Sequence, residues 1–256
     1  MSSRDLDQFY TDKKVSKDCL DIFLNIVGEN GVFLEPSAGG GSFVEHMVEK
    51  RIAFLAVDID PKHPMVMRED YLSKSYKVKG VIGNPPFGKN SSLAVKFFNK
   101  ASGEADYVGF ILPRTFEKEF FQNKLDLNMH LVFNKVLEEE SFCLDGIPYK
   151  VPCVFQVWEK RGYKRHKIKV SKVFVEEVPK DLAEYSIRRV GGKSGEVMDG
   201  VNYNESSTYF VRDVIEGSKD LIKDSFYEIN KLSERTAGMK SITLKEINLY
   251  LGGKNV

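Results

Sequence analysis

Apolar residues in the first part of the chain follow two patterns that alternate. Four short runs are almost continuously apolar, at residues 31–35, 53–57, 78–82 and 107–112. Around them, apolar residues recur every three or four positions, at residues 15–27, 43–51, 93–101 and 116–125. Short apolar runs are typical of strands covered on both faces, and the wider spacing is typical of helices packed on one face. The alternation predicts an α/β domain with a mostly parallel sheet.

Two further runs, Leu131 to Val136 and Val151 to Trp158, follow without a helical pattern between them. We expect these two strands to close the sheet as an antiparallel hairpin. We place a boundary soon after them, which divides the chain into a domain of residues 1–160 and an appended element of residues 161–256.

The appended element has a pattern of its own. Residues 185–190 and 208–211 are strand-like, and apolar residues between 221 and 232 have helical spacing. Thr243 and Glu246 are spaced as a capping box before a final short helix, which we expect to stop at Gly252. This pattern predicts a small α+β element.

Composition narrows the class of protein. The chain has 38 Lys and Arg against 37 Asp and Glu, a formal net charge of +1, so any nucleic-acid site must be local. Apolar runs are too short to span a bilayer, and the N-terminus lacks an apolar signal region, so we expect no membrane association. The three cysteines show no paired spacing and the four histidines are scattered. We therefore expect a reducing, cytoplasmic location and no metal site.

The first predicted strand ends in an acid and a glycine-rich turn. Glu35 precedes Gly39 and Gly41 with the spacing Glu-x-x-x-Gly-x-Gly, which differs from the dinucleotide pattern Gly-x-Gly-x-x-Gly. A carboxylate at this strand end would repel a pyrophosphate but attract an ammonium group. The next strand ends at Asp58, from which a carboxylate can accept from both hydroxyls of a ribose. A turn or helix cap is the alternative role for Asp58.

The stretch that follows the third predicted strand reads Asn84-Pro85-Pro86-Phe87. Two prolines fix φ and lack an N–H, so this turn is stiff and poor in donors. Asn84 and the Pro85 carbonyl offer acceptors beside the flat ring of Phe87. These groups suit a planar amine on a ring, such as N6 of adenine. A tight turn plugged by an aromatic ring is the alternative interpretation.

Together these residues resemble the S-adenosylmethionine-dependent N6-adenine methyltransferases, whose catalytic motif is Asp/Asn-Pro-Pro followed by Tyr, Phe or Trp. The resemblance covers about residues 8 to 158. It implies a class I methyltransferase fold, a Rossmann-like and mostly parallel seven-stranded sheet with a closing antiparallel hairpin. It also implies a catalytic role for Asn84, Pro85, Pro86 and Phe87. The S-adenosylmethionine cofactor would be bound by Phe9, Tyr10, Thr11, Glu35, Pro36, Ser37, Gly39, Gly41, Asp58, Ile59, Asp70, Tyr71 and Asn84.

The resemblance also implies individual roles. Residues 9–11 would close over the methionine end of the cofactor, with an aromatic arm packed on the core as the alternative. Asp70 would accept from the adenine amino group of the cofactor and Tyr71 would pack on its ring, with a solvated turn as the alternative. Asn84 and the Pro85 carbonyl would orient the target amine, and Phe87 would stack on the target base.

Residues Lys160 to Lys172 contain many cations and no acid. We interpret this basic run as a stripe that contacts phosphates, with a solvated linker as the alternative. The resemblance also implies that the tip of the closing hairpin supplies an aromatic ring to the target base. Tyr149 and Phe142 are the candidates, and Phe142 fits the core better. The candidate substrate-binding residues are Phe87, Tyr149, Lys164, Arg165 and Lys167.

The sequence thus predicts an N6-adenine methyltransferase acting on DNA, whose target adenine must leave a duplex stack to react. An RNA N6-adenine methyltransferase is the first alternative, and a protein glutamine N5-methyltransferase is the second. A catalytically silent nucleic-acid-binding relative is the third. Phe87 and the basic run favour a base over a peptide, and the intact set of cofactor residues argues against a silent relative.

Overall fold

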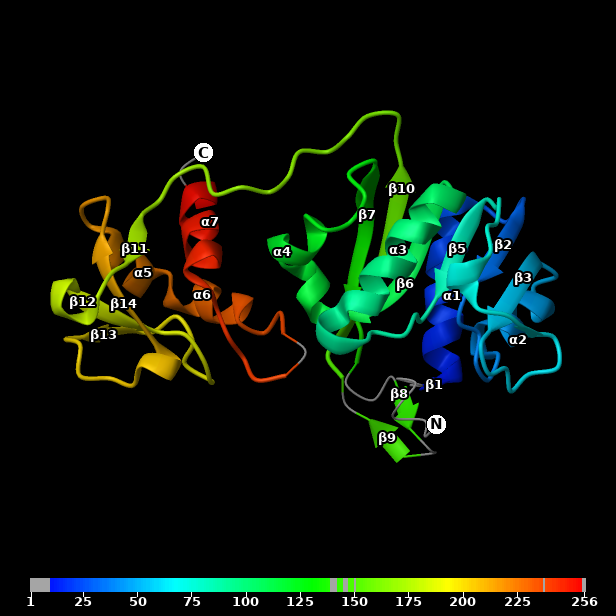
Figure 1. The fold of residues 1–256 in the computed structure, drawn as a ribbon, viewed down its shortest axis with the longest axis horizontal. Coiled ribbons are helices and arrows are strands. Elements are labelled where there is room, and N and C mark those ends of the chain that lie inside the picture. Colours follow the sequence, from blue (N-terminus) through cyan, green and yellow to red (C-terminus); the bar gives the residue numbers. More distant parts are fainter. Residues whose placement is uncertain (1–9, 139–141, 145–146, 150, 237, 255–256) are drawn as a thin grey trace. The chain divides into compact units, whose positions relative to one another are not determined.

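The computed structural model describes residues 10–138, 142–144, 147–149, 151–236 and 238–254. The chain forms two compact units (Figure 1). The first comprises Met1–Phe116 and Phe120–Lys167, and the second comprises Glu117–Glu119 and Ile168–Val256. The first unit therefore runs past residue 160, where the sequence placed the end of the domain.

The elements of the first unit alternate between strands and helices as far as β6, except that β4 follows β3 without a helix between them. The described elements in chain order are β1 (Tyr10–Thr11), α1 (Lys13–Val27), β2 (Val32–Glu35), α2 (Ser42–Glu49), β3 (Ala53–Asp58), β4 (Met67–Arg68), η1 (Tyr71–Ser73), β5 (Gly80–Gly83), η2 (Lys89–Ser91), α3 (Ser92–Glu104), β6 (Tyr107–Pro113), η3 (Arg114–Glu117), α4 (Glu119–Gln122), β7 (Met129–Val136), β8 (Phe142–Leu144), β9 (Ile147–Tyr149) and β10 (Cys153–Lys160).

The main sheet has seven strands in the order β4-β3-β2-β5-β6-β10-β7. The first five are parallel to one another, and β10 is antiparallel to both of its neighbours. This mostly parallel sheet, closed by the β7–β10 hairpin, confirms the predicted class I methyltransferase fold. Because the five parallel strands run the same way, the residues that follow them meet along one edge of the sheet.

Helices cover both faces of this sheet, as its apolar strands require. On β2, Phe33 packs with α1 and α2, and the adjacent Leu34 packs in the cluster that contains α3. The alternation follows from the two-residue repeat of a strand. It fixes the register of β2, and with it the place where Glu35 leaves the sheet.

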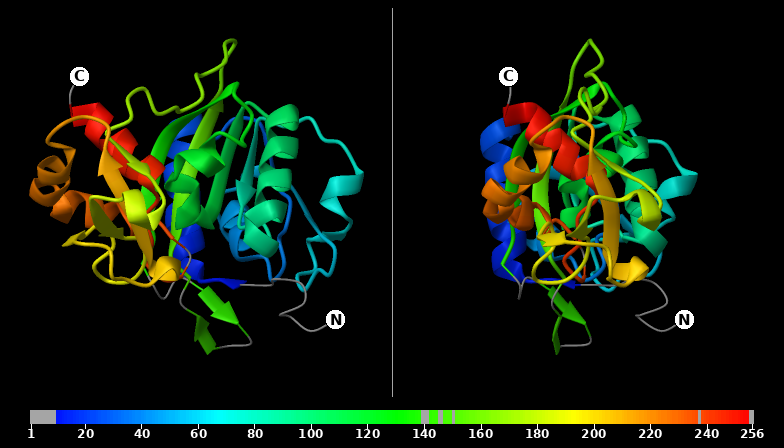
Figure 2. Two further views of the ribbon diagram at one scale, coloured as in Figure 1. Left: turned by 60° about the vertical axis from the view of Figure 1, so that its left-hand side comes forward. Right: turned by 90° about the vertical axis from the view of Figure 1, so that its left-hand side faces the viewer.

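A second, small sheet joins distant parts of the chain. β1 pairs antiparallel with β8, and β8 pairs antiparallel with β9, in the order β1-β8-β9. In both views of Figure 2 the β8–β9 hairpin projects beyond the strand ends of the main sheet. The hairpin lies between β7 and β10 in sequence, so the predicted closing hairpin carries a further hairpin at its tip.

The start of α3 differs from what its sequence suggests. Serines are good N-caps, and Ser91 and Ser92 stand at the start of this helix. Ser91 occupies the N-cap position, but its φ is 58° and its side chain makes no capping hydrogen bond. Asn90, directly before it, also has a positive φ of 53°. Two consecutive left-handed residues follow the Asn-Pro-Pro-Phe turn, a conformation that residues other than glycine rarely adopt.

The second unit has a four-stranded antiparallel sheet in the order β11-β14-β12-β13, with three α-helices among its described residues. Its described elements are β11 (Val175–Glu177), η4 (Lys180–Leu182), β12 (Tyr185–Arg188), β13 (Val197–Asp199), η5 (Glu205–Ser207), β14 (Thr208–Asp213), α5 (Ser218–Asp224), α6 (Phe226–Leu232) and α7 (Leu244–Lys254).

The last helix shows one success and one error of the sequence prediction. The capping box is present, because Glu246 accepts from the backbone N–H of Thr243 and the Thr243 hydroxyl accepts from the backbone N–H of Glu246. However, α7 continues through Gly252 to Lys254 instead of stopping. A Cβ at Gly252 would lie 3.6 Å from the Ser171 hydroxyl, an ordinary van der Waals distance, so packing does not require glycine at this position.

The described residues contain neither a helix that could span a membrane nor a cluster that could hold a metal. No helix there combines the length and the apolar character needed to cross a bilayer. No group of three or more His, Cys, Asp or Glu side chains there is arranged to hold a metal ion.

Candidate active site

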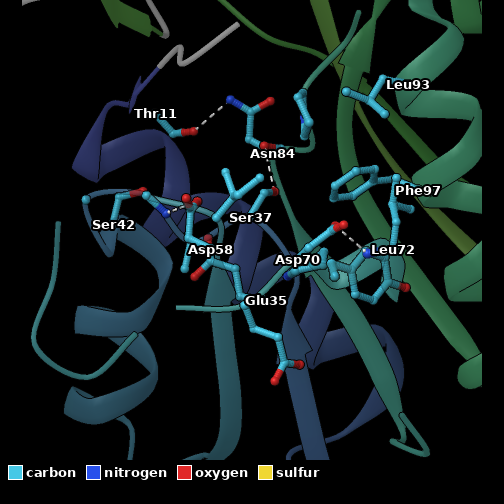
Figure 3. Close-up of a pocket in the computed structure, with 18 of the residues that line it drawn as sticks. Thr11, Glu35, Ser37, Ser42, Asp58, Asp70, Leu72, Asn84, Leu93 and Phe97 are labelled. Atoms are coloured by element: carbon cyan, nitrogen blue, oxygen red, sulfur yellow. Dashed lines mark hydrogen bonds between the residues drawn. The ribbon is translucent and has the colours of Figure 1, made fainter. Parts of the chain in front are cut away.

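A cavity of about 730 Å³ lies at the edge of the sheet where the parallel strands end. Four polar residues reach it from four neighbouring strands: Asp70 follows β4, Asp58 ends β3, Glu35 ends β2 and Asn84 follows β5. Figure 3 shows these side chains around the cavity. Its full lining is Thr11, Lys13, Glu35, Pro36, Ser37, Ala38, Gly39, Gly40, Ser42, Asp58, Ile59, Glu69, Asp70, Tyr71, Leu72, Asn84, Pro86, Gly88, Lys89, Leu93 and Phe97.

Glu35 is a carboxyl group held almost entirely out of water. It is 2% exposed, and its Oε2 has no hydrogen-bond partner among the described residues. Burial, and secondarily the charge of Asp58, raise the pKa of Glu35 from 4.5 to about 8. An ionised carboxylate in such a place needs a cationic partner, since burying an unpaired charge is costly.

Asp58 is also buried, but its oxygens are partly satisfied. Oδ2 accepts from the backbone N–H of Gly39 at 2.8 Å, and Oδ1 accepts from that of Asp60 at 2.7 Å. The first of these bonds ties the glycine-rich turn to the end of β3. A carboxylate has about four acceptor positions, so two remain for a ligand.

Asp70 and Tyr71 both line the cavity, and both are engaged within the fold. The Asp70 carboxylate accepts from the backbone N–H of Leu72 at 2.9 Å and caps η1. Tyr71 is 2% exposed and donates its hydroxyl proton to Glu104 at 2.8 Å. Its buried ring packs on Phe97, with 5.1 Å between the ring centroids. Tyr71 therefore forms part of the cavity wall.

Asn84 is held by contacts at its backbone and at its side chain. The hydroxyl of Ser37 donates to the main-chain carbonyl of Asn84 at 3.1 Å. The side-chain amide donates from Nδ2 to Oγ1 of Thr11 at 3.2 Å. Figure 3 shows Asn84 between Thr11 and Ser37, with Glu35 at the opposite side of the view.

Several residues assigned from the sequence lie beside the cavity and are not part of its lining. Pro85 is buried, and Phe87 is half-buried and packs against both core clusters of the first unit. Gly41 has a φ of 82°, and a side chain there would come within 2.6 Å of the His63 ring. This glycine is thus needed for packing within the turn as well as for its conformation.

Four candidate residues lie partly or wholly outside the described part of the chain. Phe9 precedes the first described residue. The backbone of Tyr149 belongs to β9, but its side chain is not described, and the same is true of Phe142 in β8. The side chain of Tyr10 is likewise not described.

The sequence analysis missed the wall that α3 contributes. Leu93 and Phe97 line the cavity from α3, one turn apart. The sequence assigned both to the core face of the helix. Only Gly88 and η2 separate the Asn-Pro-Pro-Phe turn from α3. The four-residue spacing of this pair, so close to that turn, was the available signal.

The basic run begins at the opposite edge of the sheet from Asn84. In the antiparallel pairing of β10 with β6, Cys153 is opposite Pro113 at the cavity end, and Glu159 is opposite Tyr107 at the far end. The run starts where β10 ends. For a strand of this length, that end lies about 20 Å from the cavity end of β10.

Arg165 has a structural role that the charge pattern did not predict. Its guanidinium donates to the main-chain carbonyls of Met129 and Gln122 and lies 5.4 Å from the centre of the Trp158 ring. Burial lowers the pKa of Arg165. Lys164 and Lys167, in contrast, are exposed, and neither makes a hydrogen bond or ion pair among the described residues.

Neither a protein-family model nor a curated protein matches this chain. Solved structures with a similar fold include an RNA methyltransferase candidate from Pyrococcus horikoshii, 20% identical over 60% of this chain and 87% of that one, with a TM-score of 0.48. The 23S rRNA methyltransferase ErmE is 16% identical over 61% of this chain and 71% of its own, with a TM-score of 0.44.

A third similar structure extends over more of the chain. The modification subunit of a candidate type I restriction enzyme from Vibrio vulnificus YJ016 is 14% identical over 86% of this chain and 53% of its own, with a TM-score of 0.44.

Proposed function

We propose that this protein is an S-adenosylmethionine-dependent methyltransferase that modifies N6 of adenine in DNA. The observation that carries the proposal is the order of groups along one sheet edge. Asp70, Asp58, Glu35 and Asn84 follow four neighbouring strands in that order and line one cavity. This order matches the order of adenine, ribose, methionine and target amine in such a reaction.

The lining of the cavity suits this cofactor. Asp70, with the apolar Ile59 and Leu72, would hold the adenine ring, and the free acceptor positions of Asp58 would hold the ribose hydroxyls. Glu35 would pair with the ammonium group, which supplies the cation that its buried carboxylate requires. The lining contains four carboxylates and two lysines, a balance that favours a cationic ligand over a polyphosphate.

Asn84 and the Pro85 carbonyl would act on the target amine. The lone pair of an adenine amine is delocalised into the ring, so the free amine is a poor nucleophile. Accepting both of its protons localises that lone pair on nitrogen. When bound, S-adenosylmethionine supplies a methyl group on a cationic sulfur, and the amine proton can leave to water after transfer. No general base of perturbed pKa is needed at Asn84.

Base and phosphate contacts complete the proposal. Phe87, half-buried after the two prolines, is the residue proposed to stack on the extruded base. Tyr149 remains a prediction for the same role. Lys89 is exposed at the rim of the cavity, and Lys164 and Lys167 stay predicted phosphate contacts at the other edge.

The proposal is tested by methyl transfer from labelled S-adenosylmethionine to DNA, RNA and protein pools, followed by nucleoside mass spectrometry. N6-methyladenine in DNA is the expected product. If N6-methyladenine appeared only in RNA, the proposed reaction would stand and the assignment of DNA as the substrate would be wrong. Label found only on protein glutamine, or in no pool, would contradict the proposal as a whole.

A further inference from the structure

The hydrogen bond between Thr11 and Asn84 connects residues that are 73 positions apart in the chain. Thr11 is only 9% exposed, and both residues line the cavity. Figure 3 shows the Thr11 hydroxyl directed at the Asn84 amide from the segment before α1. The proposed catalytic amide of Asn84 thus bonds to a residue that lies outside the Asn-Pro-Pro-Phe turn.

An asparagine amide needs help to keep one orientation. Rotation about χ2 of Asn is broad, since it joins an sp³ carbon to an sp² carbon. The two ends of the amide also have opposite chemistry, because Oδ1 accepts hydrogen bonds and Nδ2 donates them. With Nδ2 directed at Thr11, the amide carries Oδ1, its acceptor end, on the opposite side.

The position of Thr11 is itself set by strand pairing. Thr11 ends β1 and pairs with Phe142 of β8. The backbone of Asn84 is anchored separately, by the bond from Ser37 to its carbonyl. The Ser37 bond therefore holds the turn, while the Thr11 bond acts on the rotation of the side chain.

We infer that Thr11 is a positioning residue for the reaction, which holds the Asn84 amide in the plane that presents Oδ1 to the target amine. This inference rests on the proposed function and departs from the sequence interpretation, which assigned Thr11 to the cofactor. A cofactor contact would affect binding, whereas a positioning contact affects the rate once both substrates are bound.

The test uses the full chain, with single-turnover methyl transfer measured at saturating S-adenosylmethionine on the nucleic-acid pool that the wild type modifies. Thr11→Val keeps the shape of the side chain and removes the hydroxyl. We expect a rate loss of about 10-fold, less than the 10²–10³ expected for losing a group that touches the reacting atoms. Thr11→Ser should restore most of the rate. Thr208→Val, which removes a buried hydroxyl from β14, is the control for folding.

A second arm separates positioning from support of the fold. In an Asn84→Asp background the two carboxylate oxygens are equivalent, so a half-turn about χ2 changes nothing. Thr11→Val should therefore cost at most about two- to threefold in that background, and this non-additivity is the expected signature. An equal loss in both backgrounds would overturn the inference.

Two further outcomes distinguish the possible failures. If Thr11→Val weakened cofactor binding in calorimetry and left the saturated rate unchanged, Thr11 would be a cofactor contact and the inference would be wrong. If Asn84→Ala itself transferred methyl at the wild-type rate, the proposed function would fail first, whatever the Thr11 variants did.

Discussion

The hydroxyl of Ser37 donates a hydrogen bond to the main-chain carbonyl of Asn84, at 3.1 Å. Ser37 belongs to the glycine-rich turn after β2, and Asn84 opens the turn after the adjacent strand β5. The two turns that would hold the cofactor and the target amine are therefore fastened to each other. A substitution that weakens this bond should therefore affect both turns.

Replacing Ser37 by alanine tests this connection. The lost bond should lower the free energy of unfolding by about 0.5–1.5 kcal/mol, and it should reduce both cofactor affinity and transfer rate. Ser207→Ala in the second unit also removes a hydroxyl bonded to a backbone carbonyl, and it should change stability alone. A Ser37→Ala protein with normal cofactor affinity and normal rate would show that the turns act independently.

Glu35 should give the protein a distinctive pH dependence. Its pKa of about 8 in the fold exceeds its ordinary value of 4.5, so the folded state binds more protons than the unfolded state between these values. The contribution of Glu35 to the free energy of unfolding is therefore complete below about pH 4.5 and is lost as pH rises towards 8.

Denaturation of Glu35→Gln and wild type at pH 5, 7 and 9 measures this contribution. The free energy of unfolding of the variant should rise relative to that of the wild type as pH rises, by up to about 1.4 kcal/mol per pH unit. Wild-type cofactor affinity should rise over the same range as the carboxylate forms, and the variant should lack this rise. Parallel stability curves would refute the burial of an unpaired carboxyl.

Asp58 should contribute more to S-adenosylmethionine binding than its neighbour Asp60. Asp58→Ala should weaken S-adenosylmethionine binding by about 1–3 kcal/mol, the scale for hydrogen bonds to a charged group. It should also loosen the glycine-rich turn, because the bond to the Gly39 N–H is lost. Asp60 pairs with Lys62 and Arg68, so Asp60→Ala is the matched control. Calorimetry that shows equal losses would count against the ribose assignment.

The basic run offers a contrast between binding and folding. Exposed Lys164 and Lys167, changed together to alanine, should reduce the salt slope of duplex DNA binding by about 1.8. The run begins at the far edge of the sheet, out of reach of a short duplex. For a duplex of about eight base pairs centred on the adenine, the salt slope should therefore be the same for the variant and the wild type. Arg165→Ala should instead lower the free energy of unfolding, because its guanidinium donates to backbone carbonyls. If the double variant showed an unchanged salt slope on long duplexes, the run would be a solvated linker and not a phosphate contact.

The sequence revealed the features that depend on local spacing. Glu35, Asp58 and Asn84 each follow an apolar run, and parallel strands bring such ends together without further information. The capping box at Thr243 was visible for the same reason. The strand and helix patterns indicate six strands of the main sheet, and a seventh strand was implied only by the resemblance.

Features that depend on distant partners were not visible. The contact of Thr11 with Asn84 requires β1 to meet β8, and no periodicity encodes that pairing. Charge pattern could not separate Arg165, whose donors reach backbone carbonyls, from the exposed lysines beside it. Residue type suggested a serine cap for α3, but Ser91 adopts a left-handed conformation and its side chain makes no capping hydrogen bond.

Asn84 carries the central claim, that the Asn-Pro-Pro-Phe turn acts on the target amine. Asn84→Ala removes one oriented acceptor and leaves both prolines in place. Single-turnover methyl transfer at saturating S-adenosylmethionine should fall by about 10²–10³ or more, and calorimetry should show nearly unchanged cofactor affinity. A folded Asn84→Ala protein that methylates adenine at the wild-type rate would contradict the account.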